Sequence, residues 1–174
     1  YADLGLSQSR QNKLSEAIRS FRKSLAINQA FAPAHSNIAL AYLETQEAGK
    51  ALQHAKKAVE IDGRNPTYKN VQALCYRKLD QTEKAISTFK QINTAHPNFY
   101  SAHYNLYETY RLIDDITNAE DTLLRAKETF GNQANVYLAL GNFYEQTNRT
   151  LEARDLYIEG IDNCTDNPEL LIAL

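Results

Sequence analysis

One residue type recurs along the chain at a fixed interval, and this repeat constrains the fold more than any other feature. An alanine stands about every 34 residues, with no insertion or deletion over five copies. These alanines are Ala17, Ala51, Ala85, Ala119 and Ala153. Four residues after each lies a slot that favours bulk, occupied by Phe21, Ala55, Phe89, Leu123 and Tyr157. Because side chains four apart share one face of a helix, the pattern predicts a repeated, buried helix contact.

The first half of each copy carries a second pattern in the same register. A small-residue slot, which lets two helices approach closely, holds Gly5, Ala39, Ala73, Tyr107 and Gly141. Three residues later the sequence has Gln8, Tyr42, Tyr76, Tyr110 and Tyr144. Short polar stretches such as Asn12-Lys13 divide each copy, and stretches such as Asn65-Pro66 separate the copies. Such residues are typical of helix–helix turns and of helix caps. The sequence therefore predicts an all-α chain of helical hairpins.

Composition excludes several classes of protein. A net charge of −2 gives no basic field for nucleic acid. No apolar run approaches the roughly 20 residues of a membrane-spanning helix, so we expect no membrane insertion. Cys75 and Cys164 are too few for a disulfide framework, and we interpret them as buried or semi-buried thiols. They are compatible with the cytoplasm, while the periplasm stays an alternative. Because the chain starts at Tyr1 and has no Met, we expect it to belong to a longer protein.

The combined pattern of small, aromatic and alanine slots resembles the tetratricopeptide repeat family. The resemblance covers the whole chain as one repeat domain, 1–174, and implies a right-handed superhelical solenoid of helix-turn-helix units. The expected units are approximately 1–31, 32–65, 66–99, 100–133 and 134–167, with 168–174 starting a further unit. The resemblance is specific for the fold and unspecific for function, because this family serves many processes.

The resemblance also implies that the first helix of each hairpin lines a concave groove where extended peptides lie. We expect the middle of this groove to hold the partner site, because cations gather there beside an amide and an aromatic ring. The predicted groove residues are Asn70, Arg77, Lys78, Tyr104, Glu108, Arg111 and Asn142. Arg offers a planar fork for carboxylates, and Tyr offers rigid contact area. An extended segment with an acidic side chain or a free C-terminus suits this set. The alternative interpretation is an ordinary solvated face whose cations are screened by Glu44 and Glu108.

No catalytic or metal-binding motif stands in the sequence. It contains no HExxH, no CxxC pair, no phosphate-cradling glycine loop and no nucleophile elbow. His35 and His103 occupy the same slot two copies apart, where packing between helices explains them better than metal ligation. We therefore expect no enzymatic activity, no cofactor and no metal.

Three functions remain open from the sequence. The first is a protein–protein interaction scaffold that binds a peptide segment or a partner domain in its groove. The second is the substrate-recruiting repeat region of a larger enzyme, such as a glycosyltransferase or sulfotransferase. The third is a structural component of a cell-envelope assembly. In addition, we expect self-association through exposed terminal repeats, because Leu170, Leu171, Ile172 and Leu174 form an apolar patch at the last helix.

Overall fold

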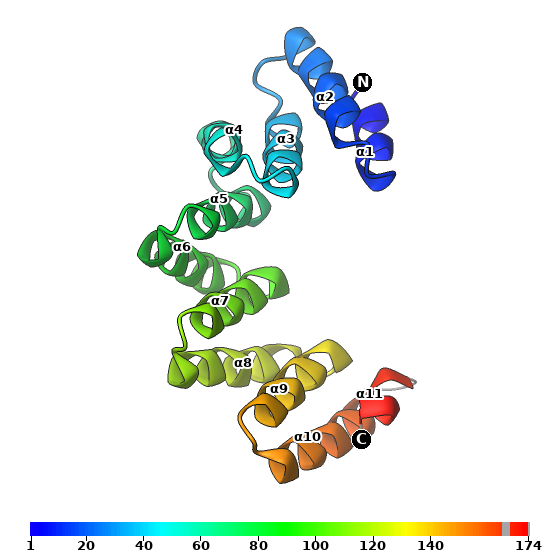
Figure 1. Cartoon of the computed structure of the whole chain (residues 1–174), viewed down its shortest axis with the longest axis vertical. Coiled ribbons are helices and arrows are strands. Elements are labelled where there is room, and N and C mark those ends of the chain that lie inside the picture. The colour runs from blue at the N-terminus through cyan, green and yellow to red at the C-terminus, as the bar shows by residue number, and fades with distance from the viewer. Residues whose placement is uncertain (165–167, 174) are drawn as a thin grey trace. The chain divides into compact units, whose positions relative to one another are not determined.

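The computed structural model describes residues 1–164 and 168–173, and this part of the chain is helical, with no strand. The described residues form eleven helices, of which the first ten follow one another in pairs joined by tight turns (Figure 1). They are α1 (Ala2–Arg10), α2 (Leu14–Ile27), α3 (Ala32–Glu44), α4 (Ala48–Ile61), α5 (Pro66–Lys78), α6 (Thr82–Ala95), α7 (Tyr100–Leu112), α8 (Ile116–Phe130), α9 (Ala134–Gln146), α10 (Thr150–Asn163) and α11 (Pro168–Ala173). The all-α hairpin fold predicted from the sequence is confirmed.

The chain divides into two compact units, Tyr1–Ile92 and Asn93–Leu174, and the division falls within α6. In the first unit α1 packs on α2, α3 on α4, and α4 on α5. In the second unit α7 packs on α8, α8 on α9, and α9 on α10. Each expected repeat boundary lies between the second helix of one hairpin and the first helix of the next.

The turn inside each hairpin has the same backbone in all five copies. The residues at this position have φ between 56° and 62°, in the left-handed region. They are Asn12, Gln46, Asp80, Asp114 and Asn148. In the first copy Lys13 N donates to Gln8 O at 2.9 Å and Asn12 N donates to Ser9 O at 2.9 Å. These two bonds satisfy the last carbonyls of α1 and form a Schellman motif.

The two repeating slots meet inside the hairpins as the sequence predicts. All five register alanines are at most 1% exposed. An added Cβ on Gly5 would lie 2.6 Å from the Phe21 ring, and one on Gly141 would lie 2.1 Å from the Tyr157 ring. Where the second helix carries a large ring, these two first helices thus have no side chain opposite it. In these two copies the glycine of the first helix thus makes room for the ring of the second.

Caps and thiols also follow the sequence. The Asn65 side chain accepts a hydrogen bond from Thr67 N at 3.0 Å and caps α5, with Pro66 in the first turn. Cys75 and Cys164 are both buried and unpaired, as interpreted. Burial raises the pKa of the Cys75 thiol to about 12, so this thiol is unreactive at neutral pH.

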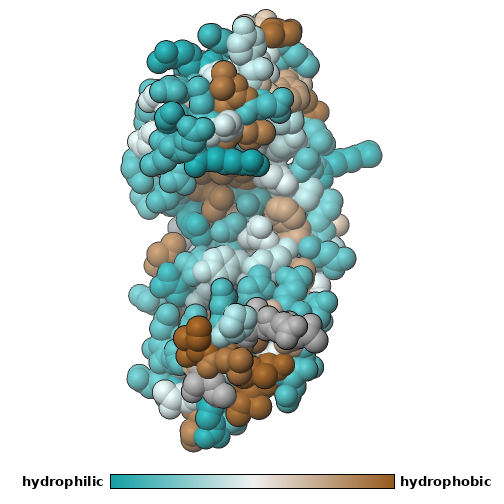
Figure 2. Space-filling view, turned by 90° about the vertical axis from the view of Figure 1, so that its right-hand side faces the viewer, coloured by the Kyte–Doolittle hydropathy of each residue, from teal (hydrophilic) through white to brown (hydrophobic). Residues whose placement is uncertain are grey.

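One expectation about the last helix is wrong. Leu170 is fully buried, because α11 packs on both α9 and α10, so it does not belong to an exposed patch. Leu171 and Ile172 are 63% and 84% exposed, whereas Leu174 lies outside the described residues. Figure 2 shows hydrophobic surface beside the grey residues near this end of the chain. No helix among the described residues is long and apolar enough to cross a bilayer.

Candidate functional site

The second unit contains a hollow of about 300 Å³ between two first helices, α7 and α9. Its lining comes from Tyr104, Tyr107, Glu108, Arg111, Ala139, Asn142 and Gln146. Because these residues recur at three- and four-residue spacings, they form one stripe on each helix. The hollow therefore joins the equivalent faces of two successive hairpins.

A forked ion pair forms the α7 side of the hollow. Arg111 Nη2 donates to Glu108 Oε2 at 2.9 Å, and Arg111 Nε donates to Glu108 Oε1 at 3.2 Å. The Glu108 side chain is 22% exposed and the Arg111 side chain 41% exposed. The hydrogen bonds and charge of Glu108 raise the pKa of Arg111, which stays cationic. Because the fork uses Nε and Nη2, Nη1 of Arg111 can donate to a partner.

Stacked tyrosines form the wall beside this pair. The Tyr104 ring is 40% exposed and lies between the rings of Tyr100 and Tyr107, with centroids 6.3 and 5.7 Å away. Tyr107 is buried and meets Phe143 of α9 edge to face at 6.1 Å. Burial raises the pKa of Tyr107, with a further contribution from the Glu108 charge. Tyr107 is therefore neutral at pH 7, and ring contacts hold Tyr104 on both sides.

An oriented amide forms the α9 side. The Tyr157 hydroxyl donates to Asn142 Oδ1 at 3.2 Å. Burial raises the pKa of Tyr157, and the nearby Glu145 charge raises it further, so the hydroxyl stays a donor at neutral pH. With Oδ1 of Asn142 occupied, its NH₂ group is left to donate into the hollow. Gln146 adds a second exposed amide one turn later, and Ala139 leaves space between the two helices.

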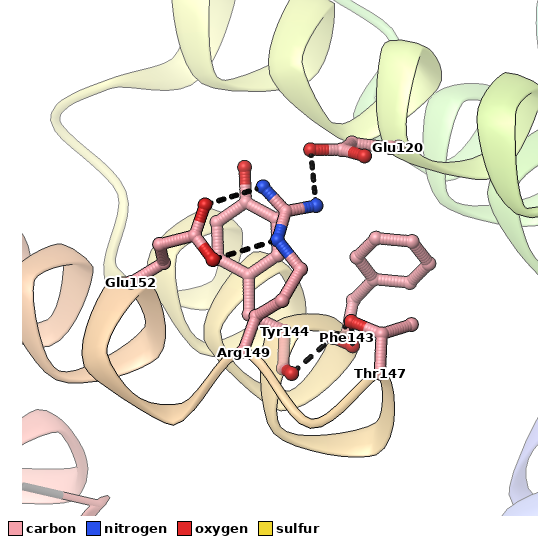
Figure 3. Close-up of polar contacts among 6 residues, drawn as sticks. All are labelled: Glu120, Phe143, Tyr144, Thr147, Arg149 and Glu152. Atoms are coloured by element: carbon pink, nitrogen blue, oxygen red, sulfur yellow. Dashed lines mark hydrogen bonds and ion pairs between the residues drawn. The ribbon is translucent and has the colours of Figure 1, made fainter.

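A polar cluster at the α9–α10 turn fixes the position of α9. Arg149 Nη1 donates to Glu120 Oε1 at 2.8 Å, while Arg149 Nε and Nη2 donate to the two oxygens of Glu152 at 2.7 and 2.6 Å (Figure 3). The guanidinium group also lies 4.1 Å from the Tyr144 ring centroid. The cluster thus ties α8 to α9 and α10, and all three nitrogens of the fork face acceptors within it. We assign it a structural role.

The structure brings four of the predicted groove residues together and leaves three elsewhere. Tyr104, Glu108, Arg111 and Asn142 all line the hollow of the second unit. The other three lie on α5 in the first unit: Asn70 is buried, Arg77 half-buried and Lys78 exposed. The expectation that the cations in the middle of the groove form one partner site stays a prediction, since Arg77 and Arg111 belong to different units.

Two lining residues, Tyr107 and Ala139, were missing from the predicted groove, whereas Gln146 was expected on the groove face although not among the main site residues. Gln146 occupies the same repeat position as Lys78, and this register placed it on the groove face. Tyr107 stood out in the sequence only as an unusual occupant of the small-residue slot. Among the described residues, no three His, Cys, Asp or Glu side chains are placed to hold a metal ion. The hollow offers hydrogen-bond donors, a ring face and one paired cation, which are groups suited to binding a polypeptide.

Comparison with known proteins identifies the fold family. Models of the tetratricopeptide repeat match residues 2–66 and 72–98, together more than half of the chain. No curated protein sequence matches the chain significantly.

Solved structures share the fold at low sequence identity. Pseudomonas aeruginosa pilF is 21% identical, with a TM-score of 0.77 over 99% of this chain and 79% of that one. The protein TTC0263 from Thermus thermophilus is 20% identical, with a TM-score of 0.75 over 98% and 93% of the two chains. YrrB, described as a tetratricopeptide repeat protein with an unusual peptide-binding site, is 18% identical, with a TM-score of 0.62 over 99% and 89%.

Proposed function

We propose that this chain, which belongs to the tetratricopeptide repeat family, is a scaffold that binds a peptide segment of a partner protein between α7 and α9. The repeats of this family generally serve as non-enzymatic protein-interaction scaffolds. The observation that carries the proposal is the hollow itself, which has a volume of about 300 Å³. Its lining includes the exposed Tyr104 ring and the side-chain amides of Asn142 and Gln146. That YrrB has a peptide-binding site on a similar fold supports the same function.

The chemistry of the lining favours an extended peptide. The NH₂ group of Asn142 donates to a backbone carbonyl, and the Gln146 amide both donates and accepts. Tyr104 supplies flat contact area that loses little conformational entropy on binding. The two hairpins of the second unit present equivalent helix faces on α7 and α9, so an extended chain between them meets contacts from both.

Acidic side chains in the partner bind here only in competition with Glu108. The fork already satisfies Nε and Nη2 of Arg111, and the carboxylate of Glu108 repels a second carboxylate beside it. We propose that an acidic residue of the partner contacts Nη1 and that Glu108 tunes how strongly it does so. The substitution Glu108→Gln then increases the preference for acidic peptides.

Selection from a random peptide library on the whole chain tests this function. Tyr104→Ala should weaken the binding of the selected peptides at least about tenfold, since exposed aromatic anchors dominate such interfaces. Leu124→Ala on α8 is a matched control, because its side chain is also 40% exposed and lies outside the hollow. Selection on Glu108→Gln should enrich Asp and Glu. Equal binding by the parent and Tyr104→Ala, or unchanged peptide composition with Glu108→Gln, contradicts the proposal.

A further inference from the structure

The first unit presents three leucines at one repeat position, on three consecutive first helices. Leu6, Leu40 and Leu74 lie on α1, α3 and α5 at intervals of about 34 residues. The same position holds Glu108 and Asn142 in the second unit. The equivalent faces of the two units thus differ in chemistry, and the first is apolar where the second is polar.

These leucines are accessible although they border a packed core. Leu6 and Leu40 are each 38% exposed, and Leu74 is half-buried against the core cluster of the first unit. Since α1 contacts α3 and α3 contacts α5, the three side chains stand in a row. We call this row the leucine ladder. Figure 2 shows hydrophobic surface bordered by hydrophilic surface on the part of the visible face that the first unit forms.

One helical turn after each leucine stands an exposed charge. These are Arg10, Glu44 and Lys78, again at one repeat position. None of the ion pairs among the described residues uses any of the three. Residues four apart lie on the same face of a helix, so the charges border the ladder in the order positive, negative, positive. A complementary partner carries the order negative, positive, negative. Because this order is symmetric, the partner can bind in either direction.

The spacing of the ladder, together with its surroundings, favours a helical partner. Axes of packed helices lie about 8–10 Å apart, and we infer an interval of about this size between successive leucines. An α-helix rises about 10.5 Å over seven residues, so its side chains at every seventh position come close to this interval, as do those at every third position of an extended chain. The buried Ser36 and Asn70 beside the ladder offer few polar groups to an extended backbone.

We propose that the leucine ladder binds an amphipathic helix of a partner protein, with an apolar residue at every seventh position and an acidic, a basic and an acidic residue beside them. The inference rests on the scaffold function but not on the hollow of the second unit. It gives the chain a second binding surface with different chemistry.

A synthetic helical peptide of about 21 residues tests the proposal. It carries leucine at every seventh position, with Glu, Lys and Glu one turn after the leucines. Binding to the whole chain is measured by fluorescence polarisation, against a second peptide with Lys, Glu and Lys and a third, extended peptide with leucine at every third position. The first peptide should bind tightest, and the second about tenfold or more weaker at low salt.

Variants of the chain complete the test. Leu40→Ser should weaken binding at least about tenfold, because it removes the central apolar contact. Leu124→Ser is the matched control, at 40% exposure on α8, and circular dichroism confirms that both variants fold. Asn142→Ala should leave binding of this peptide unchanged, which separates the ladder from the hollow. Binding that survives Leu40→Ser, a preference for the extended peptide, or no binding of the first peptide overturns the proposal.

Discussion

A methyl group on Gly141 would lie 2.1 Å from Cε1 of the Tyr157 ring, so the ring occupies the space that a side chain at position 141 would need. Tyr157 is 1% exposed and donates to Asn142, so the contact fixes both the hairpin and the site. Gly141→Ala forces the ring or α9 to move. We predict a loss of about 1–3 kcal/mol in the free energy of unfolding, measured by urea denaturation.

The control for this change is Gly49→Ala, because nothing lies within 4 Å of a Cβ built on Gly49. That substitution should be neutral or slightly stabilising, as alanine favours the helical backbone. If the Gly141→Ala variant is as stable as the Gly49→Ala variant, then α9 and α10 do not lie as close together at Gly141 as described.

Most of the fold could be predicted from the sequence because its determinants repeat. The register of Ala17, Ala51 and their equivalents placed every hairpin, and Asn65-Pro66 marked a helix start correctly. The left-handed turn at Gln46 was not predicted, since this conformation is uncommon for a non-glycine residue outside Asn and Asp. Leu170 was assigned to an exposed patch because the sequence does not reveal how a terminal helix packs.

The site was predictable only in part. The helix period placed Tyr104, Arg111 and Asn142 on related faces, and they line one hollow. The sequence offered screening of the cations by Glu108 only as an alternative, because the two-bond fork between Arg111 and Glu108 depends on rotamers that the spacing does not determine. The Tyr157–Asn142 hydrogen bond joins two helices, and a single sequence carries no direct signal for such a contact.

The geometry of the Arg149 cluster leads to a prediction about thermal stability at low salt. Arg149→Lys keeps the charge but loses the planar fork that contacts Glu120 and Glu152 together. We expect the thermal midpoint to fall by roughly 2–4 °C at low salt. The same change at Arg154, whose pair with Asp155 is more exposed, should have little effect. A shift at Arg154 as large as that at Arg149 would show that the cluster adds nothing special.

We predict that a histidine pair in the first unit makes the thermal stability of the chain depend on pH. The Nδ1 atoms of His35 and His54 lie 3.0 Å apart, so one must donate and the other accept. Burial lowers the pKa of His54 to about 4, and His35 and Arg22 act in the same direction. The unfolded chain therefore binds a proton at His54 near its ordinary pKa of about 6.5, whereas the folded chain does not.

The free energy of unfolding is thus unaffected by His54 above about pH 6.5. It decreases as the pH falls from there toward 4, because only the unfolded chain takes up the proton in this range. The expected result is a thermal midpoint that drops between about pH 7 and about pH 5 in the parent. The drop should be smaller in His54→Gln, which removes the titrating group. An identical pH dependence in both proteins would mean that His54 titrates normally in the folded state.

The exposed end of α11 predicts self-association. Leu171 occupies the repeat position of His103 and Tyr137, whose rings are covered by the second helix of their own hairpins. On α11 this position is 63% exposed. We predict that copies of the chain of residues 1–174 associate through it, and we expect sedimentation of this chain to show a mass that increases with concentration. Leu171→Glu should reduce the association, whereas a strict monomer at high concentration, or association unchanged by the variant, would argue against it.

Photo-crosslinking tests the central claim, peptide binding between α7 and α9, most directly. A benzophenone amino acid replaces Gln146, which lines the hollow, or Glu128, an exposed residue of α8 outside it. Each protein is irradiated with a peptide selected on the parent, and mass spectrometry locates the crosslink. The peptide should crosslink from position 146 and not from position 128, and Tyr104→Ala should abolish the crosslink. Equal crosslinking from both positions, or crosslinking from position 128 alone, would contradict the proposed site.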